Sequence, residues 1–295
     1  MSSPVKIITH DSSFHSDDVF AVATLVLMLG DTKYEITRTR DKDLIEKADY
    51  VVDVGEVYDA DKNRFDHHQE GRAGQRDNGV PYASFGLVWK KFGEKVCGSK
   101  DVADKIDLLL VQSIDAGDNG FSYFESKIEG LYPYSIRHII NARVPTWKEN
   151  EDVDKAFFDI LDLAIDILGR EIKIQNDKRE GFFLVKGFFN KFEDNRILVL
   201  EDKLPWEEAV SENKEIIFVV VPKTNGSWSV ETARDNINNF VDRKSLPKEW
   251  GGKRAEDLIS ITGVPDAVFC HTGLFVAFAK SKEGAIALAK LALEK

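Results

Sequence analysis

Apolar and polar residues follow two distinct periodicities along the first sixty residues of the chain. Short β-branched or aromatic runs, typical of buried strands, occur at residues 5–8, 34–39 and 50–55. Between these runs, apolar residues at helical spacing predict helices at 17–29 and 41–47. The alternation of strand and helix predicts an α/β fold with a parallel sheet and helices on both of its faces.

Polar residues stand at the ends of two of these predicted strands. His10 follows the first strand and Asp53 ends the third. Because ligands of parallel sheets bind beyond the carboxyl ends of the strands, we expect both side chains at a binding edge. Asp17 and Asp18 open the helix that follows, where acidic groups face the positive end of its dipole.

The predicted elements are mainly helices from residue 83 to residue 174 and mainly strands beyond residue 180. Helical spacing predicts helices at 83–96, 102–114 and 152–174. Beyond Gly181 the pattern indicates strands at 182–185, 196–200, 216–221, 228–233 and 267–270, and a last helix at 282–293. We therefore expect an α/β domain at 1–145, a connector helix at 146–178 and a smaller α+β domain at 179–295.

Composition and charge narrow the function classes. The 295 residues are 43% hydrophobic and 31% charged, a globular balance with no disordered or repetitive tract. The net charge of −11 argues against broad, charge-driven nucleic-acid binding, so we expect no double-stranded DNA partner. The longest apolar run, 19–29, is too short for a bilayer, and residues 1–9 lack a targeting pattern. Two distant cysteines favour a reducing compartment, and we expect a cytoplasmic protein without a membrane partner.

Histidines and aspartates form the most informative pattern. Four of the six histidines lie within residues 10–68, and each candidate group stands at the end of a predicted element. The candidate ligands are His10, His15, Asp17, Asp53, Asp66, His67, His68 and one of Asp115 or Asp118. Imidazoles mixed with carboxylates suit Mn²⁺, Mg²⁺, Co²⁺ or Zn²⁺, and the absence of thiolates favours a catalytic site over structural zinc. So many ligands exceed the needs of one ion, which predicts two ions bridged by Asp53 that activate a water for phosphoryl displacement.

Each of these residues also has a structural interpretation. Asp17 could be a helix cap, and Asp53 a turn residue. Asp66 could be a metal ligand or an acceptor that orients an imidazole, and these roles stay open. His67 and His68 are neighbours, so on an extended backbone only one of them would face the metals.

Arginines are the candidates for phosphate contact, because guanidinium groups bind phosphate through two parallel hydrogen bonds. The candidates are Arg38, Arg40, Arg64, Arg143 and Arg234, together with His271 after a predicted strand. Surface ion pairing with the abundant carboxylates is the alternative for each arginine. Phe121 and Tyr123, close to Asp118, are candidates for stacking on a base.

Four segments, in order, resemble the motifs of the DHH phosphoesterase superfamily. They are 10–18 (His-Asp-Ser-Ser-Phe-His-Ser-Asp-Asp), 52–55 (Val-Asp-Val-Gly), 64–69 (Arg-Phe-Asp-His-His-Gln) and 115–120 (Asp-Ala-Gly-Asp-Asn-Gly). Within that superfamily the chain is most similar to the melanocyte-proliferating-gene (Myg-type) family. The similarity continues at 141–147, 246–252 and 268–275 and so covers nearly the whole chain.

The resemblance implies a DHH-type domain with a manganese-type dinuclear centre in the cleft between two domains. Carried over by motif, the metal ligands would be His10, His15, Asp17, Asp53 as the bridge, His67, and Asp115 with Asp118 as its alternative. His68 would face the scissile phosphate as donor or acid, with Asp66 assigned beside it to the catalytic residues. His15 stands where many superfamily members have Asp, which makes the site less anionic by one charge.

Superfamily members hydrolyse phosphoesters or phosphoanhydrides, and Myg-type members are linked to 3′–5′ RNA exonuclease activity. The resemblance therefore implies a phosphodiesterase, with Mn²⁺ as the first candidate ion, acting on RNA or short single-stranded oligonucleotides. Two alternatives stay open. One is a pyrophosphatase or a hydrolase of small nucleotides or cyclic dinucleotides, and the other is a metal-binding scaffold without turnover.

Overall fold

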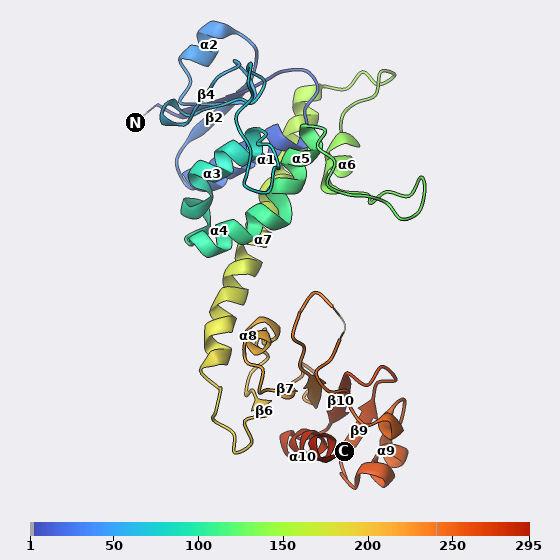
Figure 1. Ribbon diagram of the computed structural model, residues 1–295. Coiled ribbons are helices and arrows are strands. Elements are labelled where there is room, and N and C mark those ends of the chain that lie inside the picture. The colour runs from blue at the N-terminus through green and yellow to red at the C-terminus, as the bar shows by residue number, and fades with distance from the viewer. Residues whose placement is uncertain (1–2, 240) are drawn as a thin grey trace. The chain divides into compact units, whose positions relative to one another are not determined.

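The computed structural model describes residues 3–239 and 241–295. The chain divides into two compact units, the first ending at Asn176 and the second beginning at Asp177. Each unit contains a five-stranded mixed sheet and helices, so both are built from α and β elements (Figure 1). Within the described residues, no helix combines the length and the apolar character needed to cross a membrane.

The sheet of the first unit has the strand order β2-β1-β3-β5-β4. Its strands are β1 (Val5–Thr9), β2 (Tyr34–Arg38), β3 (Tyr50–Val52), β4 (Tyr58–Asp59) and β5 (Arg64–Phe65). β1 pairs in parallel with β2 and β3, and β5 is parallel to β3, as the sequence pattern predicts. The sheet is nevertheless mixed rather than wholly parallel, because β4 is antiparallel to β5. β4 and β5 have two residues each, too few for a periodic signal in the sequence.

Alternate residues of this sheet face two different apolar clusters. Ile7 and Val52 belong to the main core, which includes residues of α1 (Ser16–Leu29) and α3 (Ser84–Cys97). Ile8 and Val51 point the other way and pack with Ile45 of α2 (Lys42–Glu46). Figure 1 shows α2 on one side of the sheet and α1 and α3 on the other. Helices therefore cover both faces, as predicted.

The other helical elements of the first unit follow α3. They are α4 (Lys100–Ile106), a π-helical turn (Asp107–Val111), α5 (Gln112–Asp118) and α6 (Ile136–Asn141), with a 3₁₀ turn at Ala60–Lys62 before them. The sequence predicts one helix at 102–114, whereas the structure interrupts this stretch with the π-helical turn. Such turns insert one residue into a helix and are frequent at functional sites.

The long helix α7 (Val153–Lys186) overturns one predicted strand. Residues 182–185 read as a strand because they are apolar in succession, but they form the last turn of this helix. Val185 is buried in a cluster with Leu198 and Trp206, whereas Phe183 and Leu184 are exposed. An uninterrupted apolar run does not distinguish a strand from a helix end; packing against residues further along the chain decided it.

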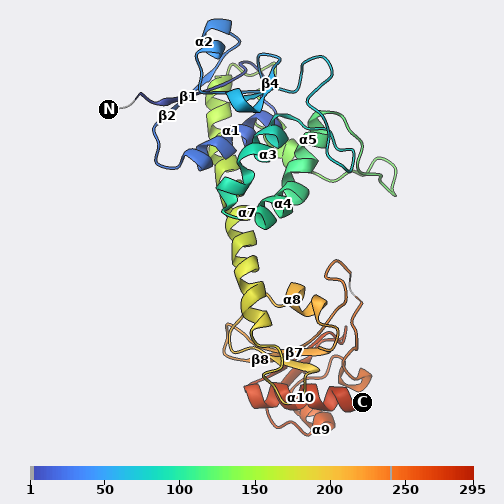
Figure 2. The same ribbon diagram turned by 60° about the vertical axis from the view of Figure 1, so that its left-hand side comes forward.

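The second unit is organised around a sheet of order β6-β7-β8-β10-β9, in which only β6 and β7 pair in parallel. Its elements are β6 (Ile197–Val199), α8 (Glu207–Glu212), β7 (Phe218–Pro222), β8 (Trp228–Thr232), a 3₁₀ turn (Lys248–Trp250), α9 (Ala255–Thr262), β9 (Ala267–Cys270), β10 (Val276–Ala279) and α10 (Lys282–Glu294). Figure 2 shows α10 against β7 and β8, where Leu288 and Ala292 join the same core as Val220 and Val230. β10 is the one strand of this sheet that the sequence pattern did not predict.

Candidate metal centre

The loop between β1 and α1 brings His10 and His15 to the carboxyl edge of the first sheet. Arg38 fixes this loop: its Nη2 donates to the Ser12 carbonyl at 2.6 Å and its Nη1 to Asp154 of α7 at 2.5 Å. The guanidinium lies 4.6 Å from the centre of the Phe157 ring, and the side chain is 1% exposed. Arg38 therefore holds the loop that positions the histidines. The sequence suggested Arg38 as a phosphate contact, but its buried side chain is not accessible to a phosphate.

His10 lies between two carboxylates. Its Nδ1–H donates to the Asp11 carbonyl at 2.8 Å, and its Nε2 is 3.3 Å from both Asp18 Oδ2 and Asp53 Oδ2. Burial would lower the pKa of His10, but Asp18 and Asp53 raise it to about 10. In the metal-free protein, protonated His10 therefore supplies the positive charge between Asp18 and Asp53 that a metal ion would supply in its place.

His67 has a similar environment. Its Nε2 is 3.2 Å from Asp118 Oδ2, 3.4 Å from Asp53 Oδ1 and 3.7 Å from Asp17 Oδ2. Against the lowering effect of burial, Asp118 and Asp53 raise the pKa of His67 to about 10. One ring nitrogen therefore faces three carboxylates at once.

Asp53 joins the two histidines. It follows β3 with a φ of +55°, in the left-handed region that Asp tolerates better than most residues. Burial would raise its pKa, but the adjacent imidazoles of His10 and His67 lower it well below its ordinary value. Ser84, at the start of α3, donates its hydroxyl to Asp53 Oδ1 at 2.8 Å and its backbone N–H to Asp17 Oδ2 at 3.3 Å. Sequence reasoning missed Ser84, because a serine at a helix start is ordinarily only a cap.

The buried polar atoms of this cluster fit a cation. Within the described part of the chain, neither Asp17 Oδ1 nor His67 Nε2 has a hydrogen-bond partner, although both are buried. Burial and the neighbouring carboxylates of Asp53, Asp118 and Asp18 raise the pKa of Asp17 well above its ordinary value. A divalent ion would satisfy these atoms and remove the repulsion. Three groups of donor atoms could hold a metal: His10–His15–Asp53, Asp53–His67–His68 and His15–Asp17–Asp118.

Asp66 orients the imidazole of His68, which is one of the two roles that the sequence left open for it. Its Oδ1 accepts from the His68 backbone N–H at 3.0 Å and pairs with His68 Nδ1 at 2.8 Å, while Oδ2 accepts from Glu56 N at 2.7 Å. The hydrogen bond with Asp66 raises the pKa of His68. The His68 side chain is 58% exposed, whereas that of His67 is 6% exposed. The two rings lie 4.3 Å apart instead of pointing opposite ways, because both residues follow β5 in a loop.

The structure separates Asp115 from Asp118. Asp118 lies at His67, as described above, whereas both oxygens of Asp115 are used elsewhere. Asp115 Oδ1 accepts from Gly86 N at 2.9 Å, and Oδ2 pairs with Arg76 Nη1 at 2.8 Å. A Cβ on Gly86 would lie 1.8 Å from Asp115 Oδ2, so only glycine leaves room for this carboxylate. Of the two alternatives, the structure brings Asp118 to the cluster.

This arrangement gives a prediction about stability. Arg76 pairs with the fully buried Asp115 and, at 2.7 Å, with Asp107 of the π-helical turn. We expect Arg76→Met to lower the free energy of unfolding of the first unit by about 3–5 kcal/mol, because it leaves Asp115 buried without its partner. Urea unfolding followed by hydrogen exchange of residues 84–118 would measure the loss. The control is Arg72→Met: Arg72 is exposed, bonds the Asn119 side chain, and should cost less than about 1 kcal/mol. Equal losses in the two variants would contradict the prediction.

Two cavities of the first unit border the cluster. One, of about 620 Å³, includes His10, Asp53, His68 and the predicted phosphate contact Arg40. The other, of about 360 Å³, includes His15, His68, Asp118 and Arg137 of α6. His15 and His68 line both cavities, so both open onto the candidate metal-binding cluster of His10, His15, Asp17, Asp53, His67, His68 and Asp118. Sequence reasoning missed Arg137, because only the fold brings α6 to this position.

The other predicted phosphate contacts lie elsewhere. Arg64 donates to the carbonyls of residues 45, 46, 48 and 62, so it closes the end of α2 instead of facing the cluster. Arg143 is exposed and lies 3.7 Å from Asp159 of α7. Arg234 and His271 belong to the second unit, where Arg234 pairs with Asp242 and the His271 ring lies against Phe275. A phosphate contact by Arg234 or His271 stays a prediction.

Comparison with known proteins gives one consistent result. Residues 6–293 match the family model MYG1_exonuc, described as an uncharacterised protein family (UPF0160). A "MYG1 protein" of Dictyostelium discoideum is 32% identical over 97% of this chain and 96% of the relative. Two relatives named "MYG1 exonuclease" are those of Bos taurus, 31% identical over 99% of this chain and 86% of its own length, and Homo sapiens, 30% identical over 99% and 87%. No solved structure gives a significant match. The chain therefore belongs to the MYG1 family (UPF0160).

Proposed function

We propose that this protein is a metal-dependent phosphodiesterase that removes nucleotides from the 3′ end of RNA or short single-stranded oligonucleotides. The observation that carries the proposal is Asp53, whose two oxygens lie 3.3 Å from His10 Nε2 and 3.4 Å from His67 Nε2. A carboxylate in this position can be shared by two ions, each also bound by one of the histidines. The relatives named "MYG1 exonuclease" support a nuclease function, with a nucleic acid as substrate.

We assign the donor atoms to two sets that share Asp53, although His15 also lies within reach of Asp17 and Asp118. His10 and His15 would hold one ion, and Asp17, His67 and Asp118 the other, with Asp53 shared. When bound, divalent ions such as Mn²⁺ would supply activation of water and neutralisation of charge on the phosphate. Asp115, the other predicted ligand, would keep α3 and α5 together through Gly86 and Arg76.

Side chains around the cluster would orient the phosphodiester. Asp66 fixes the His68 ring through Nδ1 and favours its protonated form, so His68 can donate a proton or a hydrogen bond to the phosphate from Nε2. Arg40 and Arg137, in the two neighbouring cavities, can pair with phosphate oxygens. We assign catalysis to residues 1–145, with 146–178 as the connector and 179–295 as the part that contacts substrate.

The direct test is an assay of the purified chain against a panel of substrates. With Mn²⁺ we expect hydrolysis of end-labelled single-stranded RNA and of dinucleotides, and complete loss of activity in EDTA with recovery on adding Mn²⁺. Inorganic pyrophosphate and cyclic dinucleotides serve as comparison substrates. Preferential hydrolysis of either comparison substrate would show that the proposed substrate class is wrong. Metal binding without turnover of any substrate would support a non-catalytic metal-binding scaffold instead.

Metal binding should release protons. At pH 7 His10 and His67 are protonated in the metal-free protein, since their pKa values are about 10. A metal binds only the neutral imidazole, so each ion must displace a proton and its affinity must rise with pH. We expect Mn²⁺ affinity to increase between pH 6.5 and 8.5. Calorimetry in buffers of different ionisation enthalpy would show the proton release as a buffer-dependent heat, and a pH-independent affinity would contradict the prediction.

A further inference from the structure

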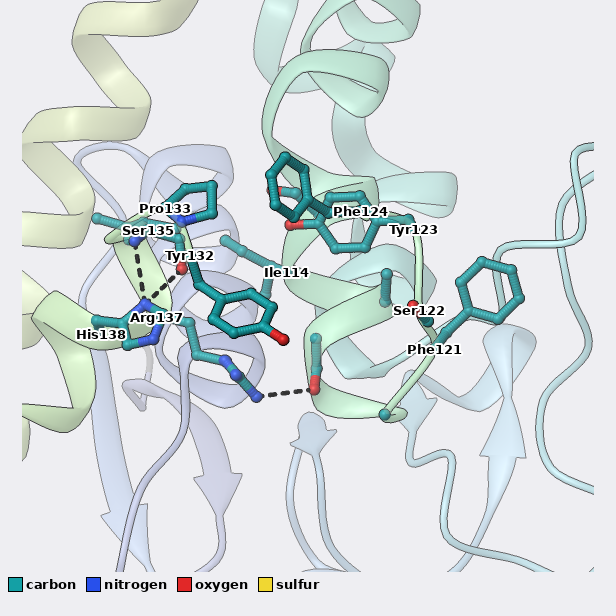
Figure 3. A pocket seen from close by; sticks show the side chains of 15 residues that line it. Ile114, Phe121, Ser122, Tyr123, Phe124, Tyr132, Pro133, Ser135, Arg137 and His138 are labelled. Carbon is teal, nitrogen blue, oxygen red and sulfur yellow. Dashed lines mark hydrogen bonds between the residues drawn. The ribbon is translucent and has the colours of Figure 1, made fainter. Parts of the chain in front are cut away.

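A third pocket of the first unit differs in chemistry from the two cavities that border the candidate metal-binding cluster. It has a volume of about 480 Å³, within the range of about 300–1,000 Å³ typical of small-molecule sites. Helix α5 forms its floor, and aromatic residues from the segment that follows α5 form its walls. Figure 3 shows the rings of Tyr123, Phe124 and Tyr132 around this space, while the ring of Phe121 points away from them.

The walls are open to solvent. Tyr132 is 69% exposed, Tyr123 58% and Phe124 49%. The floor includes Ile114 and Ala116, which are almost completely buried. The pocket therefore offers free aromatic faces above a closed apolar base, which suits a flat, partly apolar ligand.

This aromatic pocket adjoins the metal-ligating cluster. It shares Gly117 and Arg137 with the cavity of about 360 Å³ that His68 and Asp118 also line. Arg137 Nη1 donates to the Gly117 carbonyl at 3.1 Å, a contact drawn in Figure 3, so the guanidinium lies at the boundary of the two spaces. A Cβ on residue 117 would lie 3.2 Å from Arg137 Cδ, so the absence of a side chain at Gly117 makes room for the arginine. A molecule with an aromatic ring next to a phosphate could thus occupy both spaces, with Arg137 between its two parts.

We propose that this aromatic pocket takes a nucleobase of the substrate whose phosphate lies at the metal-ligating cluster; this inference rests on the proposed function. Bases of any sequence can stack on aromatic rings, so the pocket would hold a terminal nucleotide without selecting its identity. With a net charge of −11, the chain as a whole does not attract an oligonucleotide, so contacts with the bases would add to its affinity.

The experiment compares substrates with and without a base. The dinucleotide pApA is offered together with analogues in which one adenine, at the 5′ or the 3′ position, is replaced by an abasic residue. The variants Tyr132→Leu and Phe124→Leu remove a ring but keep an apolar side chain, and Tyr132→Phe keeps the ring. The control is Tyr34→Leu, an exposed aromatic at the start of β2, at the edge of the sheet opposite to His10.

We expect the two ring-removing variants to lower kcat/KM for pApA by about 5- to 150-fold, the range for loss of one stacked base. Tyr132→Phe and Tyr34→Leu should stay near wild type, and one of the two abasic analogues should be cleaved equally by all variants. If pApA and both analogues respond alike, the pocket does not bind a base and the inference is wrong, while wild-type hydrolysis still supports the proposed function.

A binding measurement separates the two proposals further. Fluorescence of 2-aminopurine riboside 5′-monophosphate, measured with Ca²⁺ present, reports stacking of the base without requiring turnover. Quenching by wild type and its loss in Tyr132→Leu would support the pocket even if no substrate were hydrolysed. Absence of quenching in wild type would overturn the inference. A change of oligomeric state in Tyr132→Leu without any change in quenching would show that the pocket serves a protein contact instead.

Discussion

Replacing Asp53 should abolish hydrolysis while leaving the fold intact. We expect Asp53→Asn to lower kcat by on the order of 10³-fold or more, because the amide cannot bridge two cations or balance their charge. Asparagine is the informative substitution, since it tolerates the φ of +55° at this position and can still accept the hydrogen bond from Ser84. Asp53→Ala should be equally inactive, with added backbone strain at the same position.

Two measurements distinguish loss of the centre from loss of the fold. Mn²⁺ should raise the Tm of the wild-type protein, because the ion binds only the folded state, and should have little effect on Asp53→Asn. Metal content after dialysis should fall in the same variant. The matched control is Asp31→Asn, an exposed position in the turn before β2, which should keep both metal and activity. Wild-type rate and metal content in Asp53→Asn would rule out a bridged pair of ions.

Substitution of His67 should mainly weaken metal binding, whereas substitution of His68 should mainly slow hydrolysis. His67 Nε2 faces three carboxylates and is buried, so His67→Ala should lose metal first, with partial recovery of activity at high Mn²⁺. His68 is oriented by Asp66 and is half exposed, so His68→Ala should bind metal with near-normal affinity. Its rate of hydrolysis should fall by about 10²–10³-fold, the usual effect of losing one donor to the reacting group.

Calorimetric titration with Mn²⁺, combined with single-turnover hydrolysis, measures both effects. Asp66→Asn provides a positioning control: it keeps the size of the side chain but removes the charge that favours protonated His68. We expect this variant to keep its metals, to lose part of the rate, and to shift the pH dependence of hydrolysis downward. Loss of metal from His68→Ala together with its retention in His67→Ala would reverse the assignment of the two histidines.

The histidines and aspartates that could act as metal ligands were recognisable from the sequence. The order of His10, His15, Asp17, Asp53, His67 and His68, each after a strand or at a helix start, already predicts nitrogen and oxygen ligands at one edge of a sheet. The first three strands and their parallel pairing could be predicted because β-branched runs alternate with helical spacing. The strand predicted at 182–185 failed for the opposite reason, since short apolar runs fit both periods.

Only the tertiary structure decided which of these side chains come together. Asp115 and Asp118 are three residues apart on one helix, so periodicity alone cannot separate them. Gly86 and Arg76 remove Asp115 from the cluster, and the loop after β5 brings Asp118 and His67 together. The positions of Ser84, Arg137 and the aromatic pocket could not be predicted from the sequence either, because each depends on packing between elements that are distant in the sequence. The sequence by itself determined which ligands are available, and long-range packing decided which of them share a site.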